Sequence, residues 1–242
     1  MKLIFFSDVH ANLPALEAFF REVESVNPDA IYCLGDLVGY NVWPNEVVNE
    51  IRKRRIPTIM GNHEEALLGP AVAESAPSSR GLTRAMVSDP NRDYLINLPR
   101  RLTLSFATGQ ESYNLLLVHG SVKAINDYMV VDYPENEVLD MMRSHQAHVL
   151  LCGHTHRPFH RVIQDGDAFR HVVNIGSVGK PKDGDPRLCY AVLEVDRSTS
   201  STNPGSITVS FRRVAYNIEK AATSIEESEF DDSLALALRE AK

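Results

Sequence analysis

The chain has 242 residues, of which 43% are hydrophobic and 24% charged, a composition typical of a globular protein and not of a disordered or fibrous one. A formal net charge of −7 without a long basic block argues against a duplex nucleic-acid partner. No apolar run approaches the ~18 residues of a membrane helix, so no membrane partner is expected. The length suits one large α/β unit, and we predict a single domain over residues 1–242.

The first 61 residues alternate short apolar runs with amphipathic segments. Apolar runs predict strands at 2–6, 30–35 and 57–61, and helical spacing predicts helices at 13–26 and 44–54. This alternation is typical of a largely parallel sheet with helices packed against it. Ligand-binding side chains should then gather where loops leave the carboxyl ends of the strands.

Residues 69–99 interrupt this alternation with a stretch richer in Ala, Ser and Pro, which we interpret as an inserted helical cap. Beyond it, a helix is predicted at 134–145, and strands are predicted at 101–106, 113–120, 148–153, 169–177, 188–196 and 207–214. The last three strands alternate as antiparallel strands do, so the second half is expected to form another sheet. The acidic tail at 217–242 is expected to pack as one or two helices. The predicted fold class is therefore α/β, a two-sheet β-sandwich flanked by helices.

The amino terminus has too short an apolar run for a secretory leader. The three cysteines, Cys33, Cys152 and Cys189, each lie in an apolar, strand-like run. Buried, reduced thiols are the simplest account of them, so we predict a cytoplasmic protein.

Five strand-like segments end in a turn that carries side chains able to bind a metal. They are FFSDVHAN, CLGDLVG, IMGNHEE, LLVHGS and LLCGHTHRP. Asp8 and His10 stand two residues apart, as do His154 and His156, and in an extended segment this spacing places both side chains on one face. Carboxylates and imidazoles gathered at one place repel one another or stay incompletely paired unless a cation is present. The five turns together predict a metal site, although a lone histidine such as His119 would be structural more often than a ligand.

In this order, D-x-H, G-D, G-N-H-E, a single histidine after a strand and G-H-x-H resemble the motifs of the calcineurin-like metallophosphoesterase superfamily. The resemblance spans Asp8 to His156, and residues 174–187 resemble the segment that follows in the small bacterial phosphodiesterase branch. It implies a four-layer α/β/β/α arrangement and hydrolysis of phosphate esters.

Carried over position by position, the resemblance implies a centre for two divalent metal ions. The first ion would be held by Asp8, His10 and His156, the second by Asn62, His119 and His154, and both by the bridging Asp36. Nitrogen and oxygen ligands without thiolate suit Mn, Fe, Co, Ni or Zn, and Mn is expected in vitro. Two ions ~3.5–4 Å apart lower the pKa of a bridging water, and the resulting metal-bridging hydroxide would attack the phosphorus.

The expected catalytic residues are His63 and the bridging Asp36. The resemblance implies that His63 contacts the phosphate and protonates or stabilises the leaving oxygen. Glu64 could orient the imidazole of His63, or it could be a carboxylate in the first turn of a helix, and both interpretations stay open. The other histidines match no ligand position and are interpreted as structural or surface residues: His145, His148, His160 and His171.

Phosphate also needs donors besides the metals. The predicted substrate contacts are Asn12, Asn62, His63, Arg80 and Lys180, and further candidates on loops are Arg84, Lys182 and Arg187. Trp43, the only tryptophan, could stack on a base or could anchor the start of a helix. The insertion at 69–99 is expected to shape the substrate pocket, because loops on a rigid scaffold carry specificity.

The predicted function is a dinuclear metal-dependent phosphoesterase that hydrolyses phosphodiester, or phosphomonoester, bonds of a small nucleotide-like substrate. An asymmetric dinucleoside polyphosphate hydrolase is a specific alternative. A protein serine/threonine phosphatase ranks lower, because GDLVGYNVWPN lacks the phosphate-binding arginine that follows G-D in those enzymes. The alternative outside enzymes is a binding scaffold similar to the retromer subunit. Such a scaffold can lose ligands, whereas all seven ligand types and His63 are present here.

Overall fold

Strand β1 (Lys2–Phe6) is buried on both faces, and this determines the layered arrangement of the molecule. Ile4 and Phe6 belong to a cluster that includes side chains of the flanking helices, whereas Leu3 and Phe5 belong to a cluster between two sheets. Successive side chains of a strand point to opposite faces, so an unbroken apolar run needs apolar cover on both sides.

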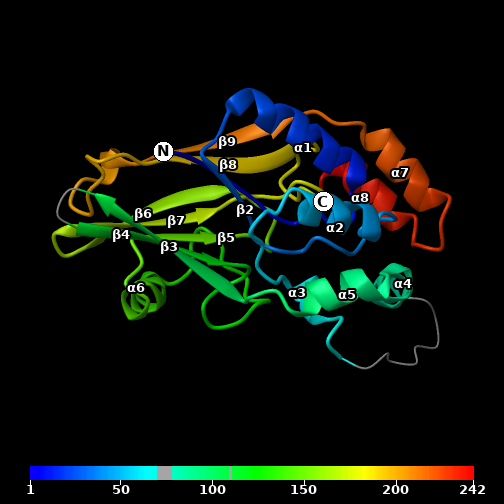
Figure 1. The fold of residues 1–242 in the computed structure, drawn as a ribbon, viewed down its shortest axis with the longest axis horizontal. Coiled ribbons are helices and arrows are strands. Elements are labelled where there is room, and N and C mark those ends of the chain that lie inside the picture. The colour runs from blue at the N-terminus through cyan, green and yellow to red at the C-terminus, as the bar shows by residue number, and fades with distance from the viewer. Residues whose placement is uncertain (70–77, 109–110) are drawn as a thin grey trace.

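The computed structural model describes residues 1–69, 78–108 and 111–242. Within these residues two mixed sheets lie face to face, one of four strands and one of five (Figure 1). The first has the order β2 (Ala30–Cys33), β1, β8 (Leu188–Glu194), β9 (Thr208–Val214). The second has the order β3 (Arg101–Thr108), β4 (Glu111–Val118), β5 (Val149–Cys152), β7 (Ala168–Asn174), β6 (Phe159–Asp165).

Helices cover the outer faces of both sheets (Figure 1). Those packed on the first sheet include α1 (Leu13–Val26) and α2 (Pro44–Lys53), and α6 (Glu135–Ser144) covers the second. The others are α3 (Asn62–Glu65), α4 (Ser79–Met86), α5 (Asp89–Ile96), α7 (Ile218–Glu226), α8 (Ser233–Glu240) and the 3₁₀ turn Pro204–Ser206. The α/β fold with two sheets flanked by helices is confirmed.

The division of strands between the sheets differs from the prediction. β8 and β9 lie in the first sheet, where β8 pairs antiparallel with β1 and places Leu193 opposite Leu3. β7 pairs parallel with β5 and antiparallel with β6, a strand that we did not predict. An alternating pattern indicates that one face is buried, but long-range packing decides which strand becomes the neighbour.

The strand predicted at 57–61 is reduced, in the part of the chain that the structure describes, to one bridge between Cys33 and Thr58. Cys33 N donates to Pro57 O and Ile59 N donates to Cys33 O, both at 3.0 Å. Pro57 has no N–H, so the segment cannot form a full ladder. The segment still runs beside β2, and this places Asn62 near the carboxyl end of that strand.

The predicted cap at 69–99 contains α4 and α5, while its residues 70–77 lie outside the described residues. Leu82 and Met86 of α4 pack on a cluster formed by the tail helices α7 and α8, and Trp43 packs on the same cluster. Asn45 Nδ2 also donates to Met86 O at 2.7 Å. Helix α4 is therefore attached to the body of the protein, and Trp43 has the packing role.

Among the described helices, none is both long enough and apolar enough to span a membrane.

Strands β6 and β7 bring two histidines into contact. His160 Nε2 and His171 Nδ1 lie 3.0 Å apart, and the two rings stack with centroids 5.3 Å apart. Burial, and then the charge of His160, lower the pKa of His171 to about 4. An unfolded histidine has a pKa of about 6.5, so between these two values the folded state binds fewer protons than the unfolded state.

We therefore expect stability to be lost as the pH falls from 6.5 toward 4. In chelated protein the unfolding free energy of wild type should fall by about 3 kcal/mol more than that of His171→Gln, which cannot titrate. Urea denaturation at a series of pH values measures the difference, and groups common to both proteins cancel. Equal pH slopes in the two proteins would contradict this assignment.

Candidate metal centre

The predicted ligands follow strands of both sheets. Asp8 and Asp36 come after the parallel neighbours β1 and β2, and His119 and His154 come after the parallel neighbours β4 and β5. The backbone N–H of His154 donates to Asp8 Oδ2 at 3.1 Å, which joins the loops of the two sheets. The carboxyl ends of strands from separate sheets therefore meet at one point.

Glycine makes this close approach possible. A Cβ atom at position 153 would lie 2.6 Å from Asp8 Oδ2, and one at position 179 would overlap the carbonyl of Val9. Only glycine, which has no Cβ, leaves room for the Asp8 carboxylate beside position 153 and for the Val9 backbone beside position 179. Gly153 and Gly179 thus let the loops after β5 and β7 reach the loop after β1.

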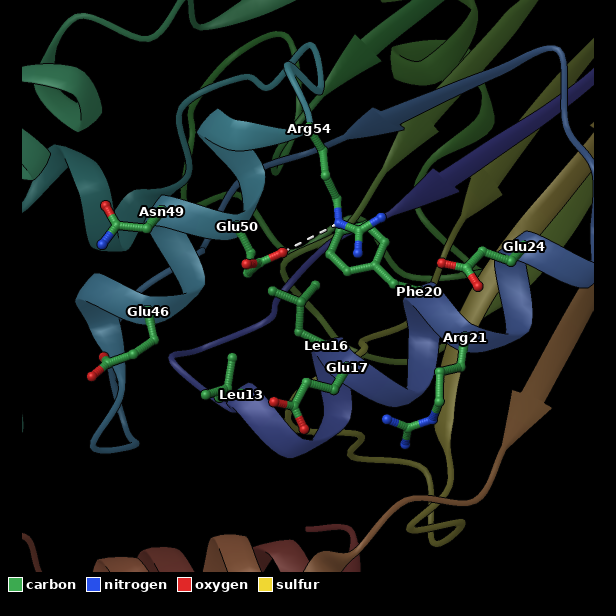
Figure 2. Close-up of a pocket in the computed structure, with 10 residues that line it drawn as sticks. All are labelled: Leu13, Leu16, Glu17, Phe20, Arg21, Glu24, Glu46, Asn49, Glu50 and Arg54. Carbon is green, nitrogen blue, oxygen red and sulfur yellow. Dashed lines mark hydrogen bonds and ion pairs between the residues drawn. The ribbon is translucent and has the colours of Figure 1, made fainter.

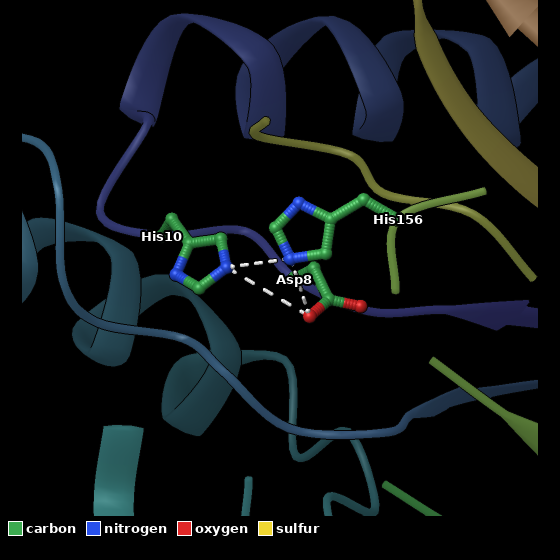
Figure 3. A group of neighbouring side chains, drawn as sticks. All are labelled: Asp8, His10 and His156. Atoms are coloured by element: carbon green, nitrogen blue, oxygen red, sulfur yellow. Dashed lines mark hydrogen bonds and ion pairs between the residues drawn. The ribbon is translucent and has the colours of Figure 1, made fainter. Parts of the chain in front are cut away.

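The side chains converge in three overlapping groups, in each of which the potential ligand atoms lie within 4.8 Å of one another. The groups are Asp8, His10 and His156; His10, Asp36 and His63; and Asp36, His119 and His154. Figure 3 shows the first group, with both imidazoles turned toward the carboxylate of Asp8. Asn62 Oδ1 lies 3.0 Å from His119 Nε2. The structure therefore brings all seven predicted ligands and His63 together.

Backbone carbonyls fix the orientation of three of these imidazoles. The Nδ1 atoms of His10 and His119 lie 3.1 and 2.8 Å from the carbonyl oxygens of Val38 and Leu34, and Nδ1 of His156 contacts that of Lys180. A carbonyl only accepts, so Nδ1 carries a proton, and in the neutral form of the imidazole, which is the form that binds a metal, the Nε2 lone pair faces the centre. Carbonyl partners of this kind orient histidines that bind metals. The Nε2 atoms of His10 and His156 lie only 3.1 Å apart, where two lone pairs repel each other unless a cation lies between them.

Two buried polar atoms at the centre have no hydrogen-bond partner among the residues that the structure describes, Asp8 Oδ1 and His154 Nε2. Asp8 Oδ1 lies 3.1 Å from His156 Nε2, but in the neutral imidazole, protonated at Nδ1, that nitrogen has no proton to donate. Leaving a buried polar atom unpaired costs about 1–3 kcal/mol. Nitrogen and oxygen donors in this arrangement suit a divalent transition metal. The residues present therefore fit a metal centre.

The charges at the centre also favour a cation. Burial raises the pKa of Asp8, but the charges of His156 and His119 outweigh burial and hold this pKa well below its usual value. Burial lowers the pKa of His119, but the Asp36 carboxylate outweighs it and raises this pKa to about 10. The two carboxylates thus attract a positive charge to this point, and a metal ion can supply it in place of a proton.

The backbone at the ligands is left-handed and not extended. Five predicted ligands have φ between 49° and 64°: Asp8, His10, Asp36, His154 and His156. The extended conformation predicted for the D-x-H and H-x-H segments is therefore wrong, although Asp8 and His10 still converge on one group. In the H-T-H segment, the side chain of His156 lies beside Asp8, whereas the side chain of His154 lies beside Asp36 and His119. Residues with a Cβ rarely adopt this conformation, and its strain is typical of functional sites.

Glu64 holds the loop of Asp36 in place. Its Oε2 accepts from the N–H groups of Asp36 and Gly61 at 2.8 Å each, and its Oε1 accepts from those of Leu37 and Val38 at 2.8 and 3.3 Å. The carboxylate is completely buried and faces the backbone, not the imidazole of His63. Glu64 is therefore a carboxylate in the first turn of helix α3, as one of the two open interpretations held, and it also ties this helix to the Asp36 loop.

A cavity of about 230 Å³ opens onto the predicted ligands. Besides ligands and His63, it is lined by Tyr40, Arg80, Asn126, Tyr128 and Lys182. Arg80 is thus placed where a substrate contact was predicted. Asn126 and Tyr128 lie in a loop without metal-ligand motifs, so nothing in the sequence marked them.

Two predicted substrate contacts lie elsewhere. Asn12 is completely buried, donates from Nδ2 to Gly179 O at 2.8 Å and to Tyr216 Oη at 3.2 Å, and caps α1 through its Oδ1. Both amide hydrogens are used, so Asn12 is structural. Lys180 Nζ donates to the carbonyl of Lys242 at 3.0 Å, outside the cavity lining. Lys182 lines the cavity in its place.

The other basic candidates also have partners away from the cavity. Arg84 donates to Leu67 O at 2.9 Å, and Arg187 pairs with Asp185 at 2.7 Å. Neither side chain lines the cavity.

A larger cavity of about 540 Å³ lies between α1 and α2 (Figure 2). Leu13, Leu16 and Phe20 line it, and Arg54 Nε lies 3.4 Å from Glu50 Oε2 at its edge. None of the residues around it is a predicted ligand, so size alone does not identify the functional site.

The model of the calcineurin-like phosphoesterase superfamily domain matches residues 1–198. Uncharacterized protein MJ0912 of Methanocaldococcus jannaschii is 26% identical over 236 residues, which cover 90% of this chain and 89% of that protein. Phosphodiesterase YfcE of Escherichia coli is 29% identical over 196 residues, which cover 81% of this chain and 89% of YfcE. The crystal structure of a metallophosphoesterase from Sphaerobacter thermophilus matches with a TM-score of 0.78, at 28% identity and with both chains covered completely.

The chain therefore belongs to the calcineurin-like phosphoesterase superfamily, as its motifs predicted. It is a hydrolase that acts on phosphoester bonds, and the resemblance to small bacterial phosphodiesterases is confirmed.

We expect metal to stabilise the protein through these ligands. At a free Mn²⁺ concentration 100 times the dissociation constant, the unfolding free energy should exceed that of chelated protein by about 2.7 kcal/mol. Thermal denaturation and elemental analysis measure stability and metal content. His119→Ala should lose bound metal and most of the stabilisation, whereas the control His145→Ala should keep both. Unchanged metal content in His119→Ala would refute this ligand set.

We expect Glu64→Gln to destabilise the protein by about 3 kcal/mol, because the amide NH₂ then faces backbone donors that it cannot accept. Its metal affinity should fall as well, since the Asp36 loop loses its anchor. The matched control is Glu65→Gln, at a neighbouring carboxylate that pairs with Arg100 on the surface at 2.6 Å. Denaturation and metal titration measure the unfolding free energy and the metal affinity of both variants. Equal values for Glu64→Gln and Glu65→Gln would exclude the anchoring role.

Proposed function

We propose that the protein is a dinuclear metal-dependent phosphodiesterase that acts on small, nucleotide-like phosphate esters. The observation that carries the proposal is the convergence of seven nitrogen and oxygen ligands, from both sheets, beneath one small cavity. The relative named as a phosphodiesterase covers most of this chain and supports diester hydrolysis.

In this proposal Asp8, His10 and His156 would hold one ion, and Asn62, His119 and His154 would hold the other. Asp36 would serve both, because its Oδ2 lies 3.7 Å from His10 Nε2 and 3.3 Å from His119 Nε2. When bound, two divalent ions lower the pKa of a water and hold phosphoryl oxygens. Mn²⁺ is our choice for activity in vitro, with Fe, Zn, Ni or Co as alternatives.

His63 is proposed to contact the phosphate and the leaving oxygen. Its ring lines the cavity and packs edge to face against the rings of His10 and Tyr40, at centroid distances of 4.8 and 4.7 Å. Burial lowers the pKa of His63, although Asp36 opposes the shift, so the imidazole is neutral at pH 7. A neutral imidazole has one N–H, which can donate to a phosphoryl or leaving oxygen. The packed rings restrict its rotation, which helps to aim that N–H.

Two cations supply further phosphate donors. The exposed Arg80 and the half-buried Lys182 line the cavity, and Lys182 takes the role that we predicted for Lys180. Asp8 and Asp36 partly offset the effect of burial, which lowers the pKa of Lys182. A metal-loaded site with these two cations is suited to an anionic ester.

The complete set of predicted ligands and the adjacent cavity favour an enzyme over a binding scaffold.

The cytoplasmic location of the protein stays a prediction.

The decisive experiment is hydrolysis of bis(p-nitrophenyl) phosphate, p-nitrophenyl phosphate and a dinucleoside polyphosphate by chelated protein and by Mn²⁺-reloaded protein. We expect metal-dependent turnover, with kcat/KM largest for the diester. His63→Ala should lower kcat by about 10²–10⁴-fold, the usual contribution of a positioned acid.

His145→Ala serves as the control and should retain wild-type rates. Loaded protein that turns over none of the three esters would exclude the proposal, and a larger kcat/KM for the monoester or the polyphosphate would reassign the substrate.

A further inference from the structure

Tyr128 is a large aromatic side chain exposed directly beside the metal centre. Its side chain lines the cavity while the residue is 59% exposed. Its ring lies edge to face against that of His154, with centroids 4.7 Å apart and planes at 65°. A tyrosine this exposed gains little from burial, so its position calls for another explanation.

The loop around Tyr128 is well anchored. Asp127 accepts hydrogen bonds from Ser121 Oγ at 2.5 Å and from Tyr133 Oη at 2.8 Å. On the other side of Tyr128, Met129 is completely buried. Both chain neighbours of Tyr128 are therefore fixed, and the loop presents the ring outward at a defined place.

The cavity is too small to enclose a nucleotide. Its volume of about 230 Å³ lies below the ~300–1,000 Å³ of pockets that enclose drug-sized ligands. It has room for the phosphoryl group between the predicted ligands, Arg80 and Lys182. The organic substituents of a diester must then lie at the mouth, where Tyr128 offers an aromatic face.

We propose that Tyr128 is a stacking platform for a planar aromatic group of the substrate, a proposal that rests on the proposed function. The aromatic group belongs to the alcohol that stays bound to phosphorus after hydrolysis, here called the retained alcohol. The substrate class is thereby a phosphodiester of a nucleoside, or of another planar aromatic alcohol, in preference to an alkyl diester. Arg80, Lys182 and the metal ligands hold the phosphate. Stacking tolerates any base because every base has a π-face, so the platform selects for aromaticity and not for sequence.

Two substrates with the same leaving group test this proposal. Thymidine 5′-(p-nitrophenyl phosphate) and methyl p-nitrophenyl phosphate both release p-nitrophenolate and differ only in the retained alcohol. We expect the ratio of their kcat/KM values to fall about 10-fold in Tyr128→Leu, in line with the usual effect of removing one stacking side chain. Tyr128→Phe keeps the ring and should keep the ratio. The control is Val131→Ala, at a residue of the same loop that is 56% exposed and outside the cavity lining.

Binding provides a second readout that does not depend on turnover. Calorimetry with Mn²⁺-loaded protein compares thymidine 5′-monophosphate with methyl phosphate, and Tyr128→Leu should lower the preference for the nucleotide about 10-fold. An unchanged preference in Tyr128→Leu would overturn the platform. An equal loss in Tyr128→Phe would also overturn it, because the hydroxyl would then be responsible. If wild type hydrolyses neither ester but shows the Tyr128-dependent binding preference, the proposed function fails while the platform stands.

Discussion

The hydrogen bond from the backbone of His154 to the carboxylate of Asp8 joins the loops of the two sheets where the predicted metal ligands gather. Asp8 extends this connection through its own backbone, since its N–H donates to Gly35 O at 3.0 Å and its carbonyl accepts from Gly179 N at 2.9 Å. Loops that follow β1, β2, β5 and β7 are thus fixed relative to one residue. A shift of the Asp8 loop would displace predicted ligands on the loops after β1, β2 and β5.

Without metal, the groups gathered at this centre destabilise the folded state. Left-handed backbone at five ligands, unpaired buried atoms at Asp8 and His154, and facing lone pairs on His10 and His156 all oppose folding. The surrounding apolar clusters on both faces of each sheet supply the stability that holds these groups in place. Binding of a metal and stability of the fold are therefore coupled through the same side chains.

The sequence predicted the two helix-flanked sheets, and that these side chains converge, because both depend on local patterns. Buried strands appear as short apolar runs, and each of the five motifs immediately follows an apolar run. The remaining features depend on contacts distant in the chain. β8 joins the first sheet because β1 is available beside it, and Lys182 faces the cavity while the neighbouring Lys180 reaches the carbonyl of Lys242. The place of Tyr128 beside the site could not be predicted from the sequence, because only the fold brings its ring to His154.

The ligands and the walls of the cavity belong to different parts of the structure. Six of the seven predicted ligands are buried in loops that follow strands, and the seventh, Asn62, is half-buried at the start of α3. Arg80 and Tyr128, by contrast, are exposed, on a helix and a loop. Substitution at either exposed position leaves the backbone contacts of the ligands untouched. The side chains at the mouth of the cavity can therefore change in evolution while the backbone that positions the predicted ligands stays the same.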